Sequence, residues 1–262
     1  MRLWPSKLAI PAAVSSTNAP NATSIITTST TARWIFMVSR SLPAMELGPV
    51  LRLGTVTSTQ DVAHDLGIGS VVLADYQTGG RGRLERPWMS PVGTALLVSF
   101  VLQPNPTLSL AAGVAAAEAC GPGVRLKWPN DLLLEGRKVG GILVEVAGAR
   151  AIVGIGINLS WAPEGGATLG EDRDQLLERL LDKLQRWSVA EGPEILAAWR
   201  LHSDTLGRRV RVQLAGESIE GLAEDLADDG SLVVAGKLVS AGDVIYLRAR
   251  EDVAEPRRRD PG

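Results

Sequence analysis

The chain has 262 residues, of which 45% are hydrophobic and 21% charged, and its mean hydropathy is +0.10. This composition is typical of a globular protein with enough apolar material for one large and one small domain, and residues 1–45 hold no apolar run long enough to span a membrane. The net charge of −2 disfavours a nucleic-acid-binding function, because such surfaces are strongly basic.

The cysteine and histidine content limits the disulfides and metal sites that the chain can form. Cys120 is the only cysteine, and His64 and His202 are the only histidines. A single cysteine excludes an internal disulfide, and this set offers too few ligands for a conventional zinc centre. A reducing, cytoplasmic compartment is the simplest setting for such a chain.

Residues 1–45 differ in amino-acid composition from the rest of the chain. They contain 13 Ser or Thr residues, four basic residues and no acidic one, without a sustained apolar period. We predict a disordered leader here, and we favour a start codon assigned too far upstream over a transit peptide. Met37 and Met45 are the candidate true starts, since a folded-domain pattern begins only at Leu47.

The folded region begins with a strand, a helix and a second strand. Val50–Val56 is apolar enough for a strand, and Ser58 can cap a helix that runs to about Leu66. Val71–Asp75 follows as a buried strand. It leads directly into residues 79–88, GGRGRLERPW, which we call the glycine-arginine loop.

The glycine-arginine loop has the composition of an anion-binding loop. Gly79, Gly80 and Gly82 allow backbone N–H groups to turn toward one ligand, and three arginines add forked cationic donors. Phosphate or carboxylate suits such groups. A solvated hairpin tip explains the same residues, and the loop alone leaves these two interpretations about even.

The next segment predicts a mixed or antiparallel sheet with a covering helix. Turn signals at Glu135-Gly136 and Gly148-Ala149 suggest hairpins, and the Ala-rich stretch Leu108–Cys120 predicts a helix packed closely on the sheet. The strands are expected at Thr94–Leu102, Val124–Lys127, Leu132–Leu134, Val139–Val146 and Ile152–Leu159. The resulting fold class is α+β rather than doubly wound α/β.

Two amphipathic helices and a small β module follow. The apolar spacing predicts structural helices over Asp172–Trp187 and Ile195–Leu201. From Gly207 the pattern alternates between Gly-containing turns, which predicts about five strands in a small barrel. The expected parts of the chain are a leader (1–45), a main domain (46–206), a small domain (207–250) and a flexible tail (251–262).

Three further clusters carry polar groups at predicted strand ends. In residues 127–131, KWPND, a stiff Trp-Pro pair fixes the polar residues on either side, although a plain β-turn is favoured for this cluster alone. In Arg137–Val146, Lys138 precedes paired glycines, which suits the mouth of a site or a solvated hairpin. Gly154–Leu159 lacks the third glycine and the following helix of a dinucleotide fingerprint.

Five motifs follow one another in a recognisable order. They are TSTQ at Thr57–Gln60, YQTGGRGR at Tyr76–Arg83 with Trp88 after it, KWPND at Lys127–Asp131, RKVGGILVE at Arg137–Glu145 and GIGINLS at Gly154–Ser160. This order resembles that of the biotin protein ligases (biotin–[acetyl-CoA-carboxylase] ligases) over about residues 47–247. Five motifs in one order are far more specific than any one of them.

The resemblance implies a class II synthetase-like fold, with a mixed sheet flanked by helices and an SH3-like C-terminal barrel. It implies that biotin and MgATP give biotinyl-5′-AMP and pyrophosphate, and that a lysine of a biotin carboxyl carrier domain then displaces AMP. The leader has neither the length nor the amphipathic helices of the DNA-binding domain that some members carry. We therefore expect a monofunctional ligase, monomeric or weakly dimeric, without nucleic-acid or membrane partners.

The resemblance also implies roles for individual residues. The expected catalytic cations are Lys138, Arg81 and Arg83. The expected biotin contacts are Ser58, Thr59, Gln60, Gln77, Arg81, Gly82, Arg83, Trp88, Lys138, Gly140 and Gly141. The expected ATP or adenylate contacts are Gly80, Arg83, Arg86, Lys127, Asn130 and Asn158, with Mg²⁺ arriving on ATP near Asn130 and Asp131.

Two positions depart from the family pattern, and two other functions stay open. Glu85 stands where the family usually has glycine, which makes the loop less attractive to anions, and Gln60 stands where asparagine is commoner. Lipoate–protein ligases share the fold and the acyl-adenylate chemistry, and a non-enzymatic binding module is a third interpretation. The GRGR loop, KWPND and the C-terminal β module favour biotin, and the full set of basic side chains favours an enzyme.

Overall fold

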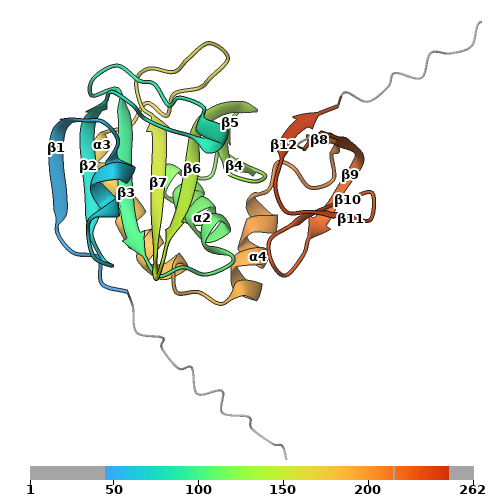
Figure 1. Ribbon diagram of the computed structural model, residues 1–262. Helices are drawn as coiled ribbons and strands as arrows, with labels where there is room; N and C mark the ends of the chain where they lie inside the picture. The colour runs from blue at the N-terminus through green and yellow to red at the C-terminus, as the bar shows by residue number, and fades with distance from the viewer. Residues whose placement is uncertain (1–44, 215, 248–262) are drawn as a thin grey trace, which may run out of the picture. The chain divides into compact units, whose positions relative to one another are not determined.

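The computed structural model describes residues 45–214 and 216–247, and Figure 1 shows how their helices and strands are arranged. The predicted leader, up to residue 44, and the predicted tail from residue 251 lie outside the described residues. None of the helices described is long and apolar enough to cross a membrane.

A seven-stranded sheet is the larger of the two sheets. Its strands lie in the order β1-β2-β3-β7-β6-β5-β4; β1 and β2 pair in parallel and all other neighbours are antiparallel. The strands are β1 (Val50–Val56), β2 (Val71–Gln77), β3 (Ala95–Leu102), β4 (Val124–Lys127), β5 (Asp131–Leu134), β6 (Arg137–Ala147) and β7 (Arg150–Asn158). The predicted mixed sheet is therefore confirmed, with hairpins on one side and a single helical crossover on the other.

The helices lie on both faces of this sheet (Figure 1). They are α1 (Thr59–His64), α2 (Leu108–Cys120), α3 (Arg173–Trp187) and α4 (Gly192–His202). α1 begins as predicted, because Ser58 caps it by accepting a hydrogen bond from the Gln60 N–H (3.3 Å). The small residues of α2 are almost all buried, which lets its backbone approach the sheet closely.

Alternation along the strands explains why helices pack on two faces. In β2, Val71 and Leu73 belong to a large core that also contains the buried residues of α2 and α3. Val72, between them, belongs to a smaller core with Ala63 of α1. Since successive side chains of a strand point to opposite faces, a continuous apolar run such as β2 is stable only when both faces are covered.

The C-terminal sheet has five antiparallel strands in the order β11-β10-β9-β8-β12. They are β8 (Arg209–Gln213), β9 (Ser218–Leu226), β10 (Leu232–Val234), β11 (Lys237–Val239) and β12 (Asp243–Tyr246). The predicted five-stranded module is present; among its described residues, the edge strands β11 and β12 do not pair with each other to close the barrel.

Specific hydrogen bonds join the turn after β4 to the segment before β8 and to the turn between β9 and β10. The backbone N–H of Trp128 donates to the hydroxyl of Thr205 (2.9 Å), and its indole N–H donates to the carbonyl of Gly230 (3.1 Å). Trp128 is 2% exposed. The turn that carries the KWPND motif is therefore held from the side of the C-terminal sheet.

Candidate active site

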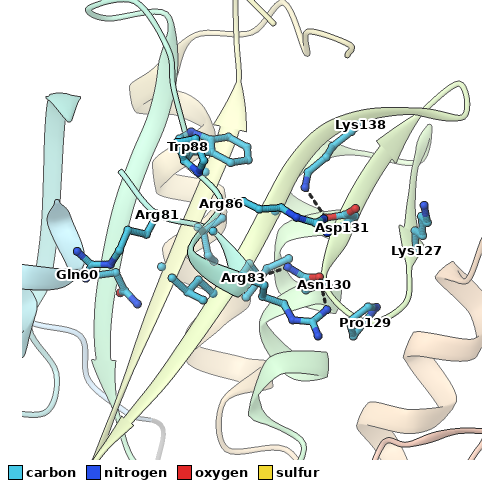
Figure 2. Close-up of a pocket in the computed structure, with 18 of the residues that line it drawn as sticks. Gln60, Arg81, Arg83, Arg86, Trp88, Lys127, Pro129, Asn130, Asp131 and Lys138 are labelled. Carbon is cyan, nitrogen blue, oxygen red and sulfur yellow. Dashed lines mark hydrogen bonds and ion pairs between the residues drawn. The ribbon is translucent and has the colours of Figure 1, made fainter. Parts of the chain in front are cut away.

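A cavity of about 600 Å³ opens where β2, the glycine-arginine loop and the turn between β4 and β5 meet. Strands β6 and β7 supply further wall residues, and β8 and β12 of the C-terminal sheet also contribute. Figure 2 shows the labelled side chains around this space. Its volume is in the range of small-molecule binding sites.

One end of the cavity is uncharged, and we call it the amide end: Ser58, Thr59, Gln60 and Gln77. The N–H and the hydroxyl of Thr59 both donate to the Gln77 side-chain oxygen, at 2.7 and 2.9 Å. The hydroxyl of Ser99 donates in turn to the Thr59 hydroxyl (2.8 Å). The first three of these residues are at most 4% exposed, so protein contacts fix their orientation before any ligand arrives.

The indole of Trp88 lies in the middle of the cavity wall, over two glycines. A Cβ atom on Gly156 would come within 2.6 Å of the ring, and one on Gly141 would lie 3.5 Å from it. Only glycine at 156 permits this approach of the ring to β7. Lys138 Nζ lies 5.8 Å from the ring centroid, so the indole also borders the charged residues beyond it.

The glycine-arginine loop closes as a tight hairpin. The N–H of Trp88 donates to the carbonyl of Gly80 (2.8 Å), and the N–H of Gly82 donates to the carbonyl of Arg86 (2.7 Å). The loop between them includes a short 3₁₀ turn, η1 (Arg83–Glu85). This geometry agrees with the predicted hairpin and turns its arginine side chains toward the cavity (Figure 2).

Arg81 and Arg83 have partners on different elements. Arg81 forms an ion pair with Asp61 of α1 (2.7 Å), and this hydrogen bond raises the pKa of the Arg81 guanidinium. Arg83 donates to the side-chain oxygen of Asn130 and to the carbonyl of Gly242, each at 3.3 Å. Burial lowers the pKa of Arg83. The loop is thereby connected to α1, to the KWPND turn and to the C-terminal sheet.

The backbone conformation at the tip of the glycine-arginine loop explains why a glycine would fit at position 85. Leu84 has φ +55° and Glu85 has φ +54°, in the left-handed region that side chains with a Cβ disfavour. Both side chains are exposed. Glu85 therefore adopts the conformation that a glycine at this position would adopt without strain, so the unusual residue leaves the hairpin intact.

The opposite end of the cavity is charged, and we call it the charged end: Arg83, Lys127, Asp131 and Lys138. Lys138 Nζ lies 2.6 Å from a carboxylate oxygen of Asp131, across the β5–β6 hairpin (Figure 2). The amide nitrogen of Asn130 donates to the carbonyl of Ile142 (2.8 Å). The end of β4 and the β5–β6 hairpin thus bring two lysines and a carboxylate to one end of the cavity.

Lys127 is partly buried beneath the C-terminal sheet. Its ammonium lies 5.0 Å from the ring centroid of Tyr246, whose other cationic neighbour is Arg208 at 4.7 Å. Burial lowers the pKa of Lys127 and raises the pKa of the Tyr246 hydroxyl, which lies 3.3 Å from the Thr205 hydroxyl. An ammonium over an aromatic face is stabilised electrostatically, so Tyr246 holds Lys127 in position.

The C-terminal sheet contributes wall residues that sequence reasoning missed: Gln213, Asp243, Val244 and Ile245. Asp243 also forms an ion pair with Arg86 of the glycine-arginine loop. In the sequence these residues are recognisable only as parts of strands with alternating polarity. Such a pattern does not show which other part of the protein a strand will face. Four strand residues that supply apolar wall were also not predicted as site residues: Leu97 and Val98, which lie in no motif, and Leu143 and Ile155, which lie inside motifs.

Three predicted contact residues do not line the cavity: Gly80, Gly140 and Asn158. A Cβ on Gly140 would meet the carbonyl of Gly156 at 2.8 Å, so Gly140 faces the neighbouring strand, whereas Gly141 faces Trp88. Asn158 is 2% exposed and donates to the carbonyl of Ala167 (3.2 Å). In the empty cavity, Gly140 and Asn158 thus contact neighbouring parts of the protein, and the ligand roles predicted for all three residues stay predictions. The other predicted site residues line the cavity together.

Comparison with known proteins places this site in a family. Residues 48–160 match the model of the Biotin/lipoate A/B protein ligase family, and residues 205–246 match that of the Biotin protein ligase C terminal domain. A biotin–[acetyl-CoA-carboxylase] ligase of Mycobacterium tuberculosis is 38% identical over 213 residues, which are 69% of this chain and 80% of that protein. The chain belongs to the biotin protein ligase family.

Solved structures of family members agree with this fold. The biotin protein ligase of Aquifex aeolicus in complex with biotin and ATP is 29% identical, with a TM-score of 0.66 over 76% of this chain and 99% of that one. The Leishmania major enzyme in complex with biotinyl-5-AMP is 26% identical, with a TM-score of 0.56 over 76% and 98%. The resemblance predicted from the five motifs is confirmed, and both matched ranges contribute walls to the cavity.

Proposed function

We propose that this protein activates biotin with ATP as biotinyl-5′-AMP and transfers the biotinyl group to a lysine of a biotin carboxyl carrier domain. The observation that carries the proposal is a single cavity with an uncharged amide end and a cationic charged end, separated by Trp88. This arrangement suits an acid with an uncharged polar ring and a carboxylate that must meet a phosphate. The names of the relatives support the same activity.

Binding of biotin would use the amide end and the indole. The amides and hydroxyls of Ser58, Thr59 and Gln77 match the donors and acceptors of a ureido ring. Trp88, packed on Gly141 and its neighbours, offers an apolar face to the rest of the bicycle. The carboxylate would then extend toward Lys138.

Adenylation needs charge neutralisation more than proton transfer. Biotin's carboxylate is already an anion, so its oxygen can attack the α-phosphorus of ATP without a general base, and pyrophosphate leaves. The main obstacle is repulsion between the carboxylate and the triphosphate. Lys138, Arg83 and Lys127, all at the charged end, would stabilise the charge that develops in the transition state.

Mg²⁺ is the cation expected with ATP, and the residues present fit that role. The residues described hold no group of three or more His, Cys, Asp and Glu side chains that could bind a metal by themselves. Mg²⁺ in nucleotide sites is held by one or two carboxylates together with phosphate oxygens. Asp131, paired with Lys138 at the charged end, is the carboxylate that would hold it, and the bound ion would lower the charge of the phosphates.

Transfer to the carrier requires a neutral acceptor amine. The ε-amine of the carrier lysine attacks the acyl carbon of biotinyl-5′-AMP, the acyl–oxygen bond breaks, AMP leaves, and the amine loses a proton. Asp131 lies beside Lys138 and is the candidate to assist that proton's departure.

The predicted monomer or weak dimer, the absence of a nucleic-acid partner and the cytoplasmic location stay predictions.

Intact mass spectrometry tests the proposal directly. The full chain is incubated with MgATP and a biotin carboxyl carrier domain, with biotin in one sample and lipoate in the other, and pyrophosphate is measured in parallel. We expect one biotinyl group on the carrier, only with biotin and only with ATP. Modification by lipoate, or neither pyrophosphate nor modification with biotin, would contradict the proposal.

A further inference from the structure

The side chain of Gln60 is buried with one end of its amide unpaired. Gln60 is 4% exposed and lies against Gly154 of β7, where a Cβ would come within 3.1 Å of the amide. Its Nε2 donates to a carboxylate oxygen of Glu145 on β6 (3.2 Å). Its Oε1 is buried and has no hydrogen-bond partner among the described residues. A buried acceptor of this kind is costly until a donor reaches it.

Gln77, across the amide end, is oriented in the opposite sense. Its Oε1 accepts two hydrogen bonds from Thr59, which leaves the Nε2 group as the end available to a ligand. A carboxylate can only accept, so Glu145 selects the donor end of Gln60. The acceptor end is left beside Gly154, which lines the cavity as Gln60 does. The cavity therefore presents an acceptor from Gln60 and a donor from Gln77.

The Glu145 carboxylate has a cation nearby that supports its charge. The guanidinium of Arg81 pairs with Asp61, and the negative charge of Glu145 contributes further to the raised pKa of Arg81. Glu145 itself does not line the cavity. It can act on a ligand only through the residue that it holds.

We propose that Glu145 is a positioning residue that fixes the Gln60 amide so that Oε1 accepts a hydrogen bond from a ureido N–H of biotin. This inference rests on the proposed function and extends it to specificity. A cyclic urea brings N–H donors, whereas the dithiolane ring of lipoate brings none and would leave the buried oxygen unpaired. A site built to pair a polar group rejects an analogue that lacks its partner.

The test compares dissociation constants, measured by calorimetry on the full chain. Glu145→Leu removes the acceptor that holds Gln60, and Glu145→Gln keeps an oxygen that can accept. Val146→Ala is the matched control, since Val146 is the next residue of β6 and is 69% exposed. We expect biotin binding to weaken about tenfold in Glu145→Leu and to change little in the other two variants. The KM for ATP should be unchanged in all three, which general damage to the fold would not allow.

Methylated biotins identify the hydrogen bond itself. The probes are biotin, N1′-methylbiotin and N3′-methylbiotin. In the wild type, methylation of the nitrogen that faces Gln60 should weaken binding about tenfold or more. The loss of affinity caused by methylation should be smaller in Glu145→Leu and in Gln60→Leu. The second variant removes the Gln60 amide directly and leaves β6 unchanged.

The outcomes separate this inference from the proposed function. If the wild type fails to bind biotin, the proposed function fails. If it binds biotin but Glu145→Leu binds equally well, or if the methylation penalties are the same in wild type and variants, the role of Glu145 is overturned and the proposed function is unaffected.

Discussion

The two ends of the cavity are built by opposite means. At the amide end, the groups are uncharged and mostly buried, and hydrogen bonds within the protein, such as those of Thr59 to Gln77, set their orientation. At the charged end, cations and carboxylates pair with one another and stay partly open to water, as in Lys138 and Asp131. Rigid neutral groups suit recognition, whereas ion pairs that can exchange partners suit a phosphate. Substitutions at the amide end should therefore change the binding of biotin, and substitutions at the charged end should change the reaction with ATP.

The largest effect is expected for Lys138→Ala. Removing this ammonium takes away a cation that stabilises the negative charge developing in the transition state, so pyrophosphate release should slow about 10²–10³-fold. Biotin affinity, determined at the amide end, should change by no more than about threefold. Stopped-flow pyrophosphate assays and calorimetry measure the two quantities. A near-normal rate of pyrophosphate release would contradict the role given to Lys138.

Alanine substitutions at the paired glycines of β6 should have different effects: one should lower the stability of the fold, and the other should weaken the binding of biotin. A methyl group on Gly140 would meet backbone at 2.8 Å, so Gly140→Ala should destabilise the fold by about 1–3 kcal/mol. Gly141→Ala meets Trp88 and Lys138 at 3.5–3.6 Å, so it fits the empty cavity but should raise the KM for biotin about tenfold. Urea denaturation and steady-state kinetics test the pair; equal loss of stability in both variants would contradict the assignment of faces.

Tyr246 should affect the charged end alone. Tyr246→Leu removes the aromatic face beside Lys127, and the KM for ATP should rise about fivefold with the KM for biotin unchanged. Tyr246→Phe keeps the ring and serves as the control. If Phe and Leu behave alike, the hydroxyl rather than the ring face would be the important group.

The lowered pKa of Lys127 predicts a pH dependence. Burial disfavours the charged form, so Lys127 loses its proton below the ordinary lysine value of 10.5. As the pH rises through the lowered pKa, kcat/KM for ATP should fall, and Lys127→Arg should move this decline to higher pH. The unfolded chain binds the proton more tightly, so this group makes the folded state more stable as pH rises through the same window. An identical alkaline limb in the arginine variant would contradict the prediction.

The smallest effect is expected at the tip of the glycine-arginine loop. Glu85→Gly relieves a left-handed backbone conformation and should stabilise that conformation by about 1 kcal/mol. Part of this gain will be offset by the greater entropy of glycine in the unfolded chain. Glu85→Ala is the control, because it removes the charge and keeps the strain. Thermal melting of the three proteins measures the difference; a gain in the alanine variant equal to that in glycine would assign the effect to charge.

The sequence predicted the local structure of both sheets well, for a physical reason. Ser58 marks a helix start, turn pairs such as Glu135-Gly136 mark hairpins, and an apolar run such as Val71–Leu73 marks a strand covered on both faces. These signals act over a few residues. The motifs also predicted most of the cavity wall, since the turn of the KWPND motif and the glycine-arginine loop both lie at strand ends.

The missed features depend on contacts that no local pattern contains. The hydrogen bond from Arg83 to Gly242 joins residues 159 positions apart, and an alternating strand does not reveal which neighbour its other face will meet. Gly140 and Asn158, which the motifs assign to the ligand, do not line the cavity; a motif names its residues without giving the face of the strand to which each belongs. The β-bulge between Leu132 and Leu133 further shifts the register beside Gly140.

The contribution of β12 to the cavity bears on when the site can first exist during synthesis. Ribosomes make the chain from its N-terminus, and all seven strands of the larger sheet precede residue 159. Asp243, Val244 and Ile245, which line the cavity, and Tyr246 beside Lys127 come much later. A nascent chain can thus pair its catalytic strands while one wall is still missing. The complete cavity can form only after the last strand has emerged and docked.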